Sequence, residues 1–171
     1  MKLGDLTDLP LTYDDVGATA ESSITEVGLP AGFNHVHVAA RIGTGRARFD
    51  QAAASVLRYG MLRGAGVRVV ASTEVAEAGT LVLGRLGPFA APCRVVYVID
   101  EPNRCGFAYG TLPGHPVAGE ERFSVRYDPA SDSVYAEIAA FSLPHTWWAK
   151  LAAPALALVQ KVVTKRYLAA V

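Results

Sequence analysis

The feature that most constrains this fold is a long run of strand-like segments between residues 67 and 141. In this run, β-branched, leucine and aromatic residues form short stretches separated by glycine, proline and acidic residues, a pattern typical of strands joined by turns. We expect strands over residues 67–74, 79–86, 94–100, 106–112, 121–127 and 133–141. Since consecutive strands of this kind pair with their neighbours, the run predicts one large antiparallel sheet.

Two amphipathic segments accompany this run. After a first expected strand at residues 33–42, apolar residues recur at intervals of three and four over residues 46–62, which predicts a short helix. The second segment, residues 145–170, is apolar over a wider face than a surface helix needs. Pro154 is expected either to kink this helix or to mark where its firm part begins. We therefore expect a long C-terminal helix that is largely covered.

These elements fit one domain over residues 1–171. Their order predicts an α+β fold of the helix-grip type, in which a strongly curved antiparallel sheet of about six or seven strands wraps around the long C-terminal helix. A curved sheet that closes on one helix leaves a cavity between them. Hydrophobic residues make up 51% of the chain and its mean hydropathy is +0.23, a surplus that we expect to line this cavity.

Charge and targeting signals argue against several classes of protein. The chain has 16 basic and 16 acidic residues, a balance that argues against a nucleic-acid-binding domain, which is normally basic. Residues 1–10 contain no apolar run, so we expect no signal peptide. The most apolar stretch, residues 151–159, is too short to span a membrane. The sequence thus predicts a soluble protein.

The two cysteines indicate the compartment. A hairpin that turns at residues 101–104 places Asp100 opposite Cys105 and Cys93 opposite Leu112. The two sulfur atoms are then several residues apart along the strands, which is too far for a disulfide. We expect two buried thiols in a reducing cytoplasm.

A motif in the middle of the chain resembles that of a known family. Residues 109–116 read Tyr-Gly-Thr-Leu-Pro-Gly-His-Pro, and Gly119, Glu120, Glu121 and Phe123 follow. With further similar stretches near both ends of the chain, this string resembles the signature of a bacterial and plant family, domain of unknown function 1990. The layout of that family is similar to the START-like helix-grip superfamily. The resemblance implies a cavity for lipids, sterols, polyketides or other hydrophobic molecules, in which a few members catalyse cyclisations or hydrolyses.

The predicted function is therefore the binding or carriage of a hydrophobic small molecule, such as a lipid, a polyketide or an isoprenoid-like compound, without a cofactor. Such cavities are mostly apolar, with a few polar groups that orient the ligand. The candidate lining residues are Tyr97, Phe107, Tyr109, His115, Phe123, Tyr135, Phe141, Trp148 and Leu151. The alternative is a cofactor-free cyclase, isomerase or hydrolase that uses His115 with Glu120 or Glu137 for acid–base catalysis.

The segment at residues 110–116 is the strongest candidate for a site. Its prolines and glycines impose a stiff path, so we expect an ordered loop that joins two central strands and packs Leu112 inward. His115 has three open roles: a latch that bonds the loop to the sheet, a ligand contact, or an acid–base residue near Glu120 or Glu121.

Glu137 interrupts an otherwise apolar strand and is open to two interpretations. If it points inward, it is a buried carboxylate with a raised pKa that needs a partner, for which Arg94 is the candidate. If it points outward, it is an ordinary solvated acid, which is the orientation we favour.

The remaining polar patterns have simpler explanations. His35 and His37 share one face of the first strand, but no third ligand supports a metal site, so we expect no metal. Residues 43–46 lack the full pattern of a nucleotide-binding loop, which favours a hinge. The basic residues of the expected C-terminal helix are Lys150, Lys161, Lys165 and Arg166. They either face solvent or make weak peripheral contact with an anionic membrane.

Overall fold

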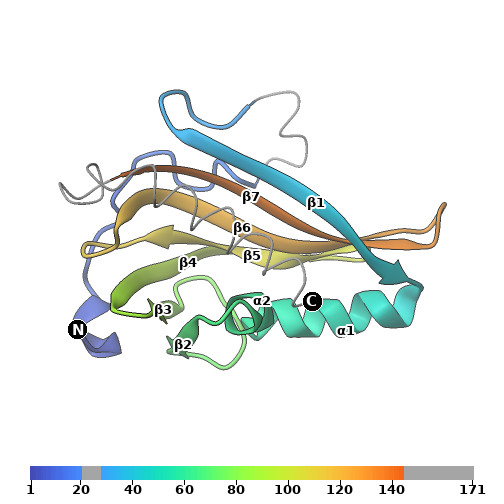
Figure 1. The fold of residues 1–171 in the computed structure, drawn as a ribbon, viewed down its shortest axis with the longest axis horizontal. Coiled ribbons are helices and arrows are strands. Elements are labelled where there is room, and N and C mark those ends of the chain that lie inside the picture. The colour runs from blue at the N-terminus through green and yellow to red at the C-terminus, as the bar shows by residue number, and fades with distance from the viewer. Residues whose placement is uncertain (21–27, 145–171) are drawn as a thin grey trace.

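The computed structural model describes residues 1–20 and 28–144, and in this part of the chain seven strands form one antiparallel sheet. The order across the sheet is β1-β7-β6-β5-β4-β3-β2, so β1 joins beside β7 at the far edge (Figure 1). The strands are β1 Asn34–Thr44, β2 Arg68–Ala71, β3 Leu81–Leu86, β4 Phe89–Glu101, β5 Arg104–Thr111, β6 Val117–Asp128 and β7 Ser133–Pro144. The helices are the 3-10 helix η1 Leu3–Leu6, α1 Arg46–Leu57 and α2 Gly60–Gly64.

The large antiparallel sheet predicted from the sequence is confirmed, and so is the register at the turn of the β4–β5 hairpin. Asp100 pairs with Cys105 as expected. Farther along the hairpin, Cys93 pairs with Thr111 instead of Leu112, because a bulge in β4 adds one unpaired residue. Both thiols are buried and free.

The ends of several strands differ from the prediction. β2 covers only part of residues 67–74, whereas β4 and β6 begin at Phe89 and Val117, several residues before the expected strands. A proline and glycines in these stretches predict turns, but each stretch has a neighbouring strand to pair with. Because β5 also continues to Thr111, the expected loop is shorter and spans residues 112–116.

The helix predicted over residues 46–62 is broken into two. Tyr59 lies between α1 and α2 in the left-handed conformation, with φ of 63°. Its ring is buried and packs edge-on against Phe107, with the ring centroids 5.5 Å apart. Next to it, a Cβ on Gly60 would lie 2.1 Å from the Oγ of Ser55. The buried ring thus anchors a sharp bend that the helical period does not reveal.

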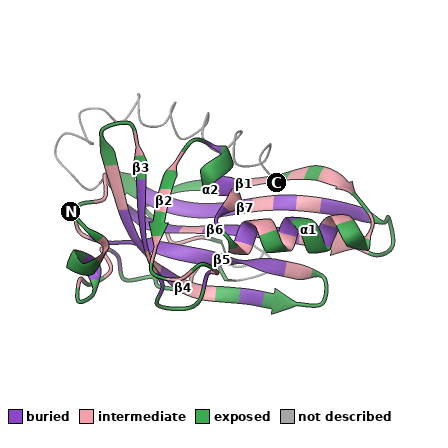
Figure 2. Cartoon of the chain, turned by 90° about the horizontal axis from the view of Figure 1, so that it is seen from below, coloured by how far each residue is buried: buried purple, intermediate pink, exposed green. Residues whose placement is uncertain are grey.

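The two faces of the sheet are covered by different parts of the chain. α1 packs on one face, here called the α1 face, which carries the main apolar core: Phe107, Phe123, Val125, Ala136 and Ile138 (Figure 2). The opposite face, here called the N-terminal face, is covered by residues 1–20, with Leu6 packed against Leu83 and Leu112. Because side chains alternate along a strand, successive residues of β6 serve opposite faces.

The loop after β5 supports the expected architecture of this region. It joins the neighbouring central strands β5 and β6, and Leu112 at its start is fully buried. Gly114 has φ of +99°, a backbone conformation that residues other than glycine rarely adopt. The path of the chain here therefore depends on glycine at this position.

The expected C-terminal helix at residues 145–170, including Trp148, Leu151 and Pro154, lies outside the described residues. Within the described ranges, none of the helices has the length and apolar character needed to cross a membrane.

Candidate functional site

Two adjacent acids on β6, Glu120 and Glu121, point to opposite faces of the sheet. Glu120 pairs across the strands with Gly110 and Phe141, and Glu121 pairs with Tyr109 and Ala140. Since paired residues in a sheet share a face, this register places Glu120 on the N-terminal face and Glu121 on the α1 face.

Glu121 lies on the α1 face beside a tyrosine. The hydroxyl of Tyr109 donates a hydrogen bond of 3.1 Å to Oε2 of Glu121. Burial raises the pKa of Glu121 to about 7, although this hydrogen bond acts in the opposite direction. A carboxyl group with this pKa exchanges its proton near neutral pH.

The surroundings of Glu121 on this face are mainly aromatic. The ring of Tyr109 packs edge-on against Phe123, with centroids 5.3 Å apart, and Phe107 lies next to both rings. These three residues belong to the main core cluster. The hydrogen-bonded side chains of Tyr109 and Glu121 are therefore a polar pair at the edge of the apolar core.

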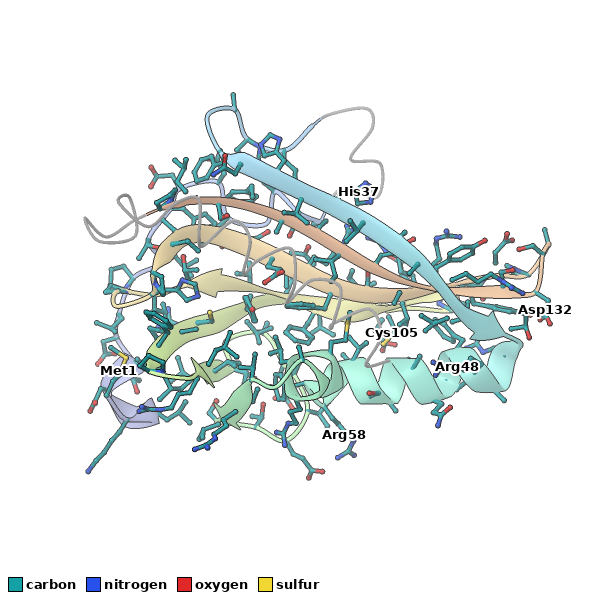
Figure 3. The ribbon with its side chains drawn as sticks, viewed as in Figure 1. Met1, His37, Arg48, Arg58, Cys105 and Asp132 are labelled. Atoms are coloured by element: carbon teal, nitrogen blue, oxygen red, sulfur yellow. The ribbon has the colours of Figure 1, made fainter. Side chains whose placement is uncertain are left out.

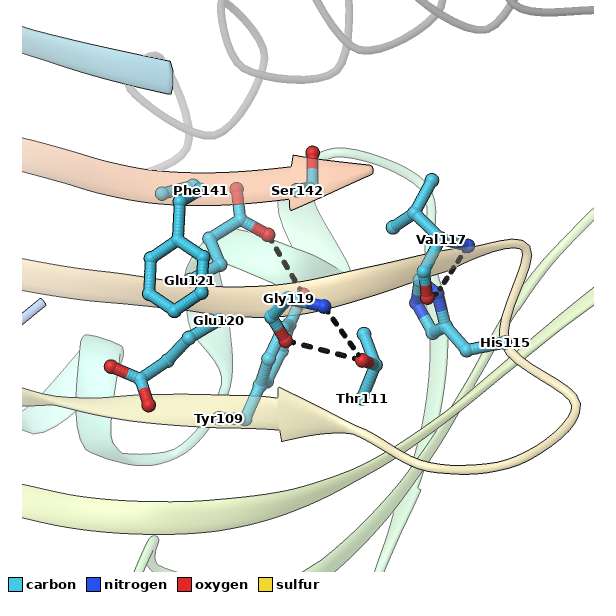
Figure 4. A pocket seen from close by; sticks show the side chains of 10 residues that line it. Tyr109, Thr111, His115, Val117, Gly119, Glu120, Glu121, Phe141 and Ser142 are labelled. Carbon is cyan, nitrogen blue, oxygen red and sulfur yellow. Dashed lines mark hydrogen bonds between the residues drawn. The ribbon is translucent and has the colours of Figure 1, made fainter. Parts of the chain in front are cut away.

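A small pocket opens at this point (Figure 4). Its volume is about 50 Å³, and its lining includes Tyr109, Thr111, His115, Glu121 and Ala140. One water molecule needs roughly 10–15 Å³ by this measure, whereas a pocket for a whole drug-sized ligand has about 300–1,000 Å³. The pocket therefore has room for a polar head group but not for a complete hydrophobic ligand.

Glu120, in contrast, is fully engaged by the N-terminal segment. Its Oε2 accepts hydrogen bonds of 2.7 Å from the hydroxyl of Tyr13 and from the backbone N–H of Gly17. Its Oε1 accepts hydrogen bonds from the backbone N–H and the hydroxyl of Thr19. Burial and the adjacent carboxylate raise the pKa of Tyr13, which keeps that hydroxyl protonated as a donor.

Gly110 makes this contact possible. A Cβ at Gly110 would lie 2.2 Å from the hydroxyl oxygen of Tyr13, so any larger residue would displace the tyrosine that reaches Glu120. The glycine of the sequence motif is thus explained by the close approach of the N-terminal segment rather than by loop flexibility.

Two arginines on the same face bind backbone carbonyl groups of the N-terminal segment. Arg122 is buried and donates to the carbonyl oxygen of Thr19 at 2.7 Å. Arg94 donates to three carbonyl oxygens around η1, those of Leu6, Thr7 and Leu9. The sequence hypothesis that Arg94 pairs with Glu137 is therefore wrong, because this guanidinium is used by η1 and lies on β4, three strands away from β7.

Glu137 instead forms an ion pair with Arg126, with Oε1 2.8 Å from Nε. It lies on the N-terminal face, since it pairs with Ser124 of β6. The guanidinium of Arg126 also lies over the ring of Tyr135, 4.7 Å from its centroid. Its side chain is 12% exposed, so the favoured interpretation of Glu137 as an ordinary solvated acid is wrong. Glu137 is a paired, mostly buried acid on the face opposite Glu121.

The structure separates the predicted lining residues into two groups. Phe107, Tyr109 and Phe123 lie together on the α1 face. Tyr97 and Phe141 lie on the N-terminal face, where Tyr97 bonds the hydroxyl of Thr19 at 2.7 Å. Phe141 borders the pocket, but its ring packs edge-on against Tyr13 and Phe33. Tyr135 lies on this second face as well, and Trp148 and Leu151 lie outside the described residues.

His115 has the geometry of the latch that was one of its three expected roles, because it bonds the loop to Val117, the first residue of β6. Its Nδ1 lies 3.0 Å from the carbonyl oxygen and 3.1 Å from the backbone nitrogen of Val117. Among the described residues, no hydrogen bond or ion pair joins any two of the candidate acid–base residues His115, Glu120 and Glu137, so these three do not form one constellation.

Neither the β1 histidines nor the loop before α1 forms a ligand site in the described residues. His35 bonds the carbonyl oxygen of Pro30 at 2.8 Å, and His37 projects from β1 away from α1 (Figure 3). In residues 1–20 and 28–144, no three His, Cys, Asp or Glu side chains form a group suited to a metal ion. The backbone N–H of Gly45 bonds the carbonyl oxygen of Asp132, which ties the hinge to the β6–β7 turn.

The position of Glu121 was missed from the sequence, where it was considered only as a neighbour of His115. The signal was present in β6, where Phe123, Val125 and Tyr127 have the same parity as Glu121. An acid at the end of an apolar stripe of alternating residues belongs to the core-facing side of the strand.

The chain matches known sequences over most of its length. The family model described as domain of unknown function (DUF1990) matches residues 12–170. A protein of Deinococcus radiodurans, described as a UPF0548 protein, is 33% identical over 141 residues, which are 74% of this chain and 71% of that protein. A UPF0548 protein of Arabidopsis thaliana is 40% identical over 76 residues, which are 41% of this chain and 37% of that protein.

Solved structures share the fold but little sequence. The hypothetical protein jhp0584 of Helicobacter pylori has a TM-score of 0.60 at 10% identity, over 94% of this chain and 95% of that chain. A point mutant of Thalictrum norcoclaurine synthase, in complex with a transition-state analogue, has a TM-score of 0.51 at 13% identity. That match covers 80% of this chain and 94% of the synthase.

Proposed function

Because the chain belongs to the family described as domain of unknown function DUF1990, as its motif predicts, we propose that it is a helix-grip protein that binds a hydrophobic small molecule. The ligand is a lipid, polyketide or isoprenoid-like compound, and the protein carries it in the cytoplasm. The observation that carries this proposal is the α1 face, an apolar and aromatic surface on which Glu121 and Tyr109 place one polar pair beside a pocket. This is the arrangement expected of a ligand site.

The other half of the site is assigned to residues 145–170. We propose that they form the gripping helix over the α1 face, with Trp148 and Leu151 completing a cavity that starts at Phe107, Tyr109 and Phe123. The shared fold supports a ligand-binding role, because the structure of norcoclaurine synthase holds a transition-state analogue. The likeness concerns the fold, so it leaves the identity of the ligand to experiment.

A second candidate is a cofactor-free enzyme of the cyclase, isomerase or hydrolase type. It is favoured by the hydrogen-bonded pair of Tyr109 and Glu121 at the pocket, in which burial raises the pKa of the acid to about 7, a value that suits a general acid or base at neutral pH. Such an enzyme would use Glu121 and Tyr109 rather than His115, Glu120 or Glu137, whose hydrogen-bonding partners lie elsewhere. Turnover of a bound ligand that ceases in Glu121→Gln while binding persists would favour the enzyme over the carrier.

Native mass spectrometry tests the proposed function. Protein purified from its own cells is expected to carry a nonpolar compound that is released on denaturation. Ala140 lines the pocket with a buried methyl group, so Ala140→Leu fills the pocket and is expected to lower the bound fraction severalfold. Ala47→Leu, on the exposed side of α1, is the matched control and should retain the ligand. Protein that carries no compound and binds no added hydrophobic ligand would contradict the proposal.

A further inference from the structure

Among the described residues, no cation is paired with the carboxyl group of Glu121. The ion pairs between these residues join Arg46 to Asp50, Arg58 to Glu74 and Arg126 to Glu137. The hydrogen-bond partner of Glu121 is the neutral hydroxyl of Tyr109. A carboxylate removed from water gains most from a cationic donor, which forms shorter and stronger hydrogen bonds than a neutral one.

The other titratable groups around Glu121 do not supply this cation. Cys93 faces it from β4, and burial raises the pKa of this thiol well above its usual range, so it is neutral. His115 lines the same pocket from the loop, where its Nδ1 lies against the backbone of Val117. Ala140 faces Glu121 from β7 and carries no charge. Among the described residues that line the pocket, Glu121 is therefore the acid that borders it from the α1 face.

The pocket and its neighbours fit a small cationic group. An ammonium group carries three donors, of which the Glu121 carboxylate accepts one or two. The ring of Tyr109 lines the pocket, with the buried rings of Phe107 and Phe123 packed against it, and aromatic faces attract cations. A volume of about 50 Å³ holds such a head group.

We propose that the ligand is a hydrophobic molecule with a protonated amine, which the carboxylate of Glu121 binds in this pocket, and that its apolar part lies along the aromatic residues of the α1 face. This inference rests on the proposed function and adds the chemical class of the ligand. Tyr109 is then a positioning residue, because its hydroxyl bonds Oε2 of Glu121 and orients the carboxylate.

Binding of an amine is coupled to the ionisation of Glu121. Since burial raises the pKa of this group to about 7, amine binding below that pH requires the carboxyl group to lose its proton. Affinity for an alkylamine should therefore fall as the pH is lowered from 8 to 6, by at most about tenfold per pH unit. Affinity for a neutral alcohol of the same chain length should not change.

Isothermal titration calorimetry with three matched ligands tests this inference. We expect the full chain to bind n-decylamine about 10–100-fold more tightly than n-decanol at pH 8, the range for a charge-assisted hydrogen bond. Decanoate should bind most weakly, because its charge repels Glu121. In Glu121→Gln, the preference for the amine and its pH dependence should disappear while decanol still binds. Glu137→Gln, which alters an acid on the N-terminal face, is the control and should behave as the wild type.

The outcomes separate this inference from the proposed function. Equal binding of amine and alcohol at pH 8, or a preference that survives in Glu121→Gln, would overturn the amine assignment and leave the hydrophobic site standing. Tighter binding of decanoate would overturn it in the same way. Failure of all three ligands to bind the wild type at either pH would overturn both.

Discussion

Glu120 and Glu121 are adjacent residues of the same type, and the two faces of the sheet use them in opposite ways. On the N-terminal face, Glu120 accepts four hydrogen bonds from Tyr13, Gly17 and Thr19. On the α1 face, Glu121 accepts one hydrogen bond from the described residues, that of Tyr109, and borders a pocket. The two acids therefore differ in how the chain satisfies them: Glu120 is buried and has several donors, whereas Glu121 is half-buried and has one donor among the described residues.

The difference arises from what covers each face. Residues 12–19 run over the sheet as irregular chain, so their backbone N–H groups need acceptors, and Glu120 supplies two of them. α1 satisfies its own backbone groups and presents Phe49, Ala52 and Val56 to the sheet. It therefore offers no donor to Glu121.

The largest effect is expected from removing the structural acid. Glu120→Ala leaves buried donors of Tyr13, Gly17 and Thr19 without an acceptor, which should reduce the free energy of unfolding by about 3–5 kcal/mol. Urea denaturation measures this loss. Glu137→Ala removes an acid from the same face whose one ion-pair partner, Arg126, is partly exposed and can be hydrated, so it should cost less than Glu120→Ala, about 1–2 kcal/mol. Equal losses in the two variants would show that the network around Glu120 does not secure the N-terminal segment.

Substitution of the second acid should instead change how stability depends on pH. The folded-state pKa of Glu121 is raised from 4.5 to about 7, so the folded protein holds this proton more tightly than the unfolded chain. Its contribution is therefore present below pH 4.5 and is lost as the pH rises to 7, at most about 1.4 kcal/mol per pH unit.

Glu121→Gln has no proton to lose at this position. Relative to the wild type, we expect it to become more stable with rising pH, by at most about 3.4 kcal/mol in total, and to reach a plateau above pH 7. Thermal unfolding of both proteins from pH 4 to pH 8 measures the difference, in which other titrating groups cancel. A difference that does not vary with pH would place Glu121 in water and remove the contrast with Glu120.

The stability of the loop at residues 112–116, which joins β5 to β6, should depend on Gly114. Gly114→Val places a β-branched residue at φ of +99°, with its Cβ 2.8 Å from Cε of Met1. We expect a loss of about 1.5 kcal/mol in the free energy of unfolding, measured by urea denaturation. Gly79 has φ of +88° and nothing within 4 Å of the position that a Cβ would take, so Gly79→Val should lose only the strain. A Gly114→Val protein as stable as the parent would contradict this account of the loop.

The smallest effect is expected at His115. As a latch, it contributes one hydrogen bond between its Nδ1 and the backbone of Val117, so His115→Ala should lower the free energy of unfolding by about 1 kcal/mol. Affinity for n-decanol, measured by calorimetry, should be unchanged. Lost affinity at unchanged stability would instead make His115 a ligand contact and widen the site beyond Glu121.

The sequence predicted the parts of this comparison that depend on local pattern. Alternating residues located the strands, and the turn at residues 101–104 fixed the pairing of Asp100 with Cys105. The same alternation carried the signal that places Glu121 with Phe123 on the apolar face, although the prediction did not use it. These features follow from neighbours along the chain.

The N-terminal face was not predictable in this way. Residues 1–20 have no period, so nothing local indicates that Tyr13 and Thr19 reach Glu120, more than 100 residues away along the chain. The actual partners of Arg94 are likewise backbone carbonyl groups, which any residue type provides. The break at Tyr59 depends on its ring fitting against Phe107, a tertiary contact that overrides the helical period.

The central claim is that Glu121 binds a cationic ligand, whereas Glu120 has all its hydrogen-bond donors within the fold. Carbon-13 NMR of the side-chain carboxyl groups, assigned with Glu121→Gln, tests it most directly. The account predicts that Glu121 titrates near pH 7 in the free protein and that n-decylamine lowers its pKa, because a cation favours the ionised form. A Glu121 signal that titrates near 4.5 and does not respond to the amine would contradict the account.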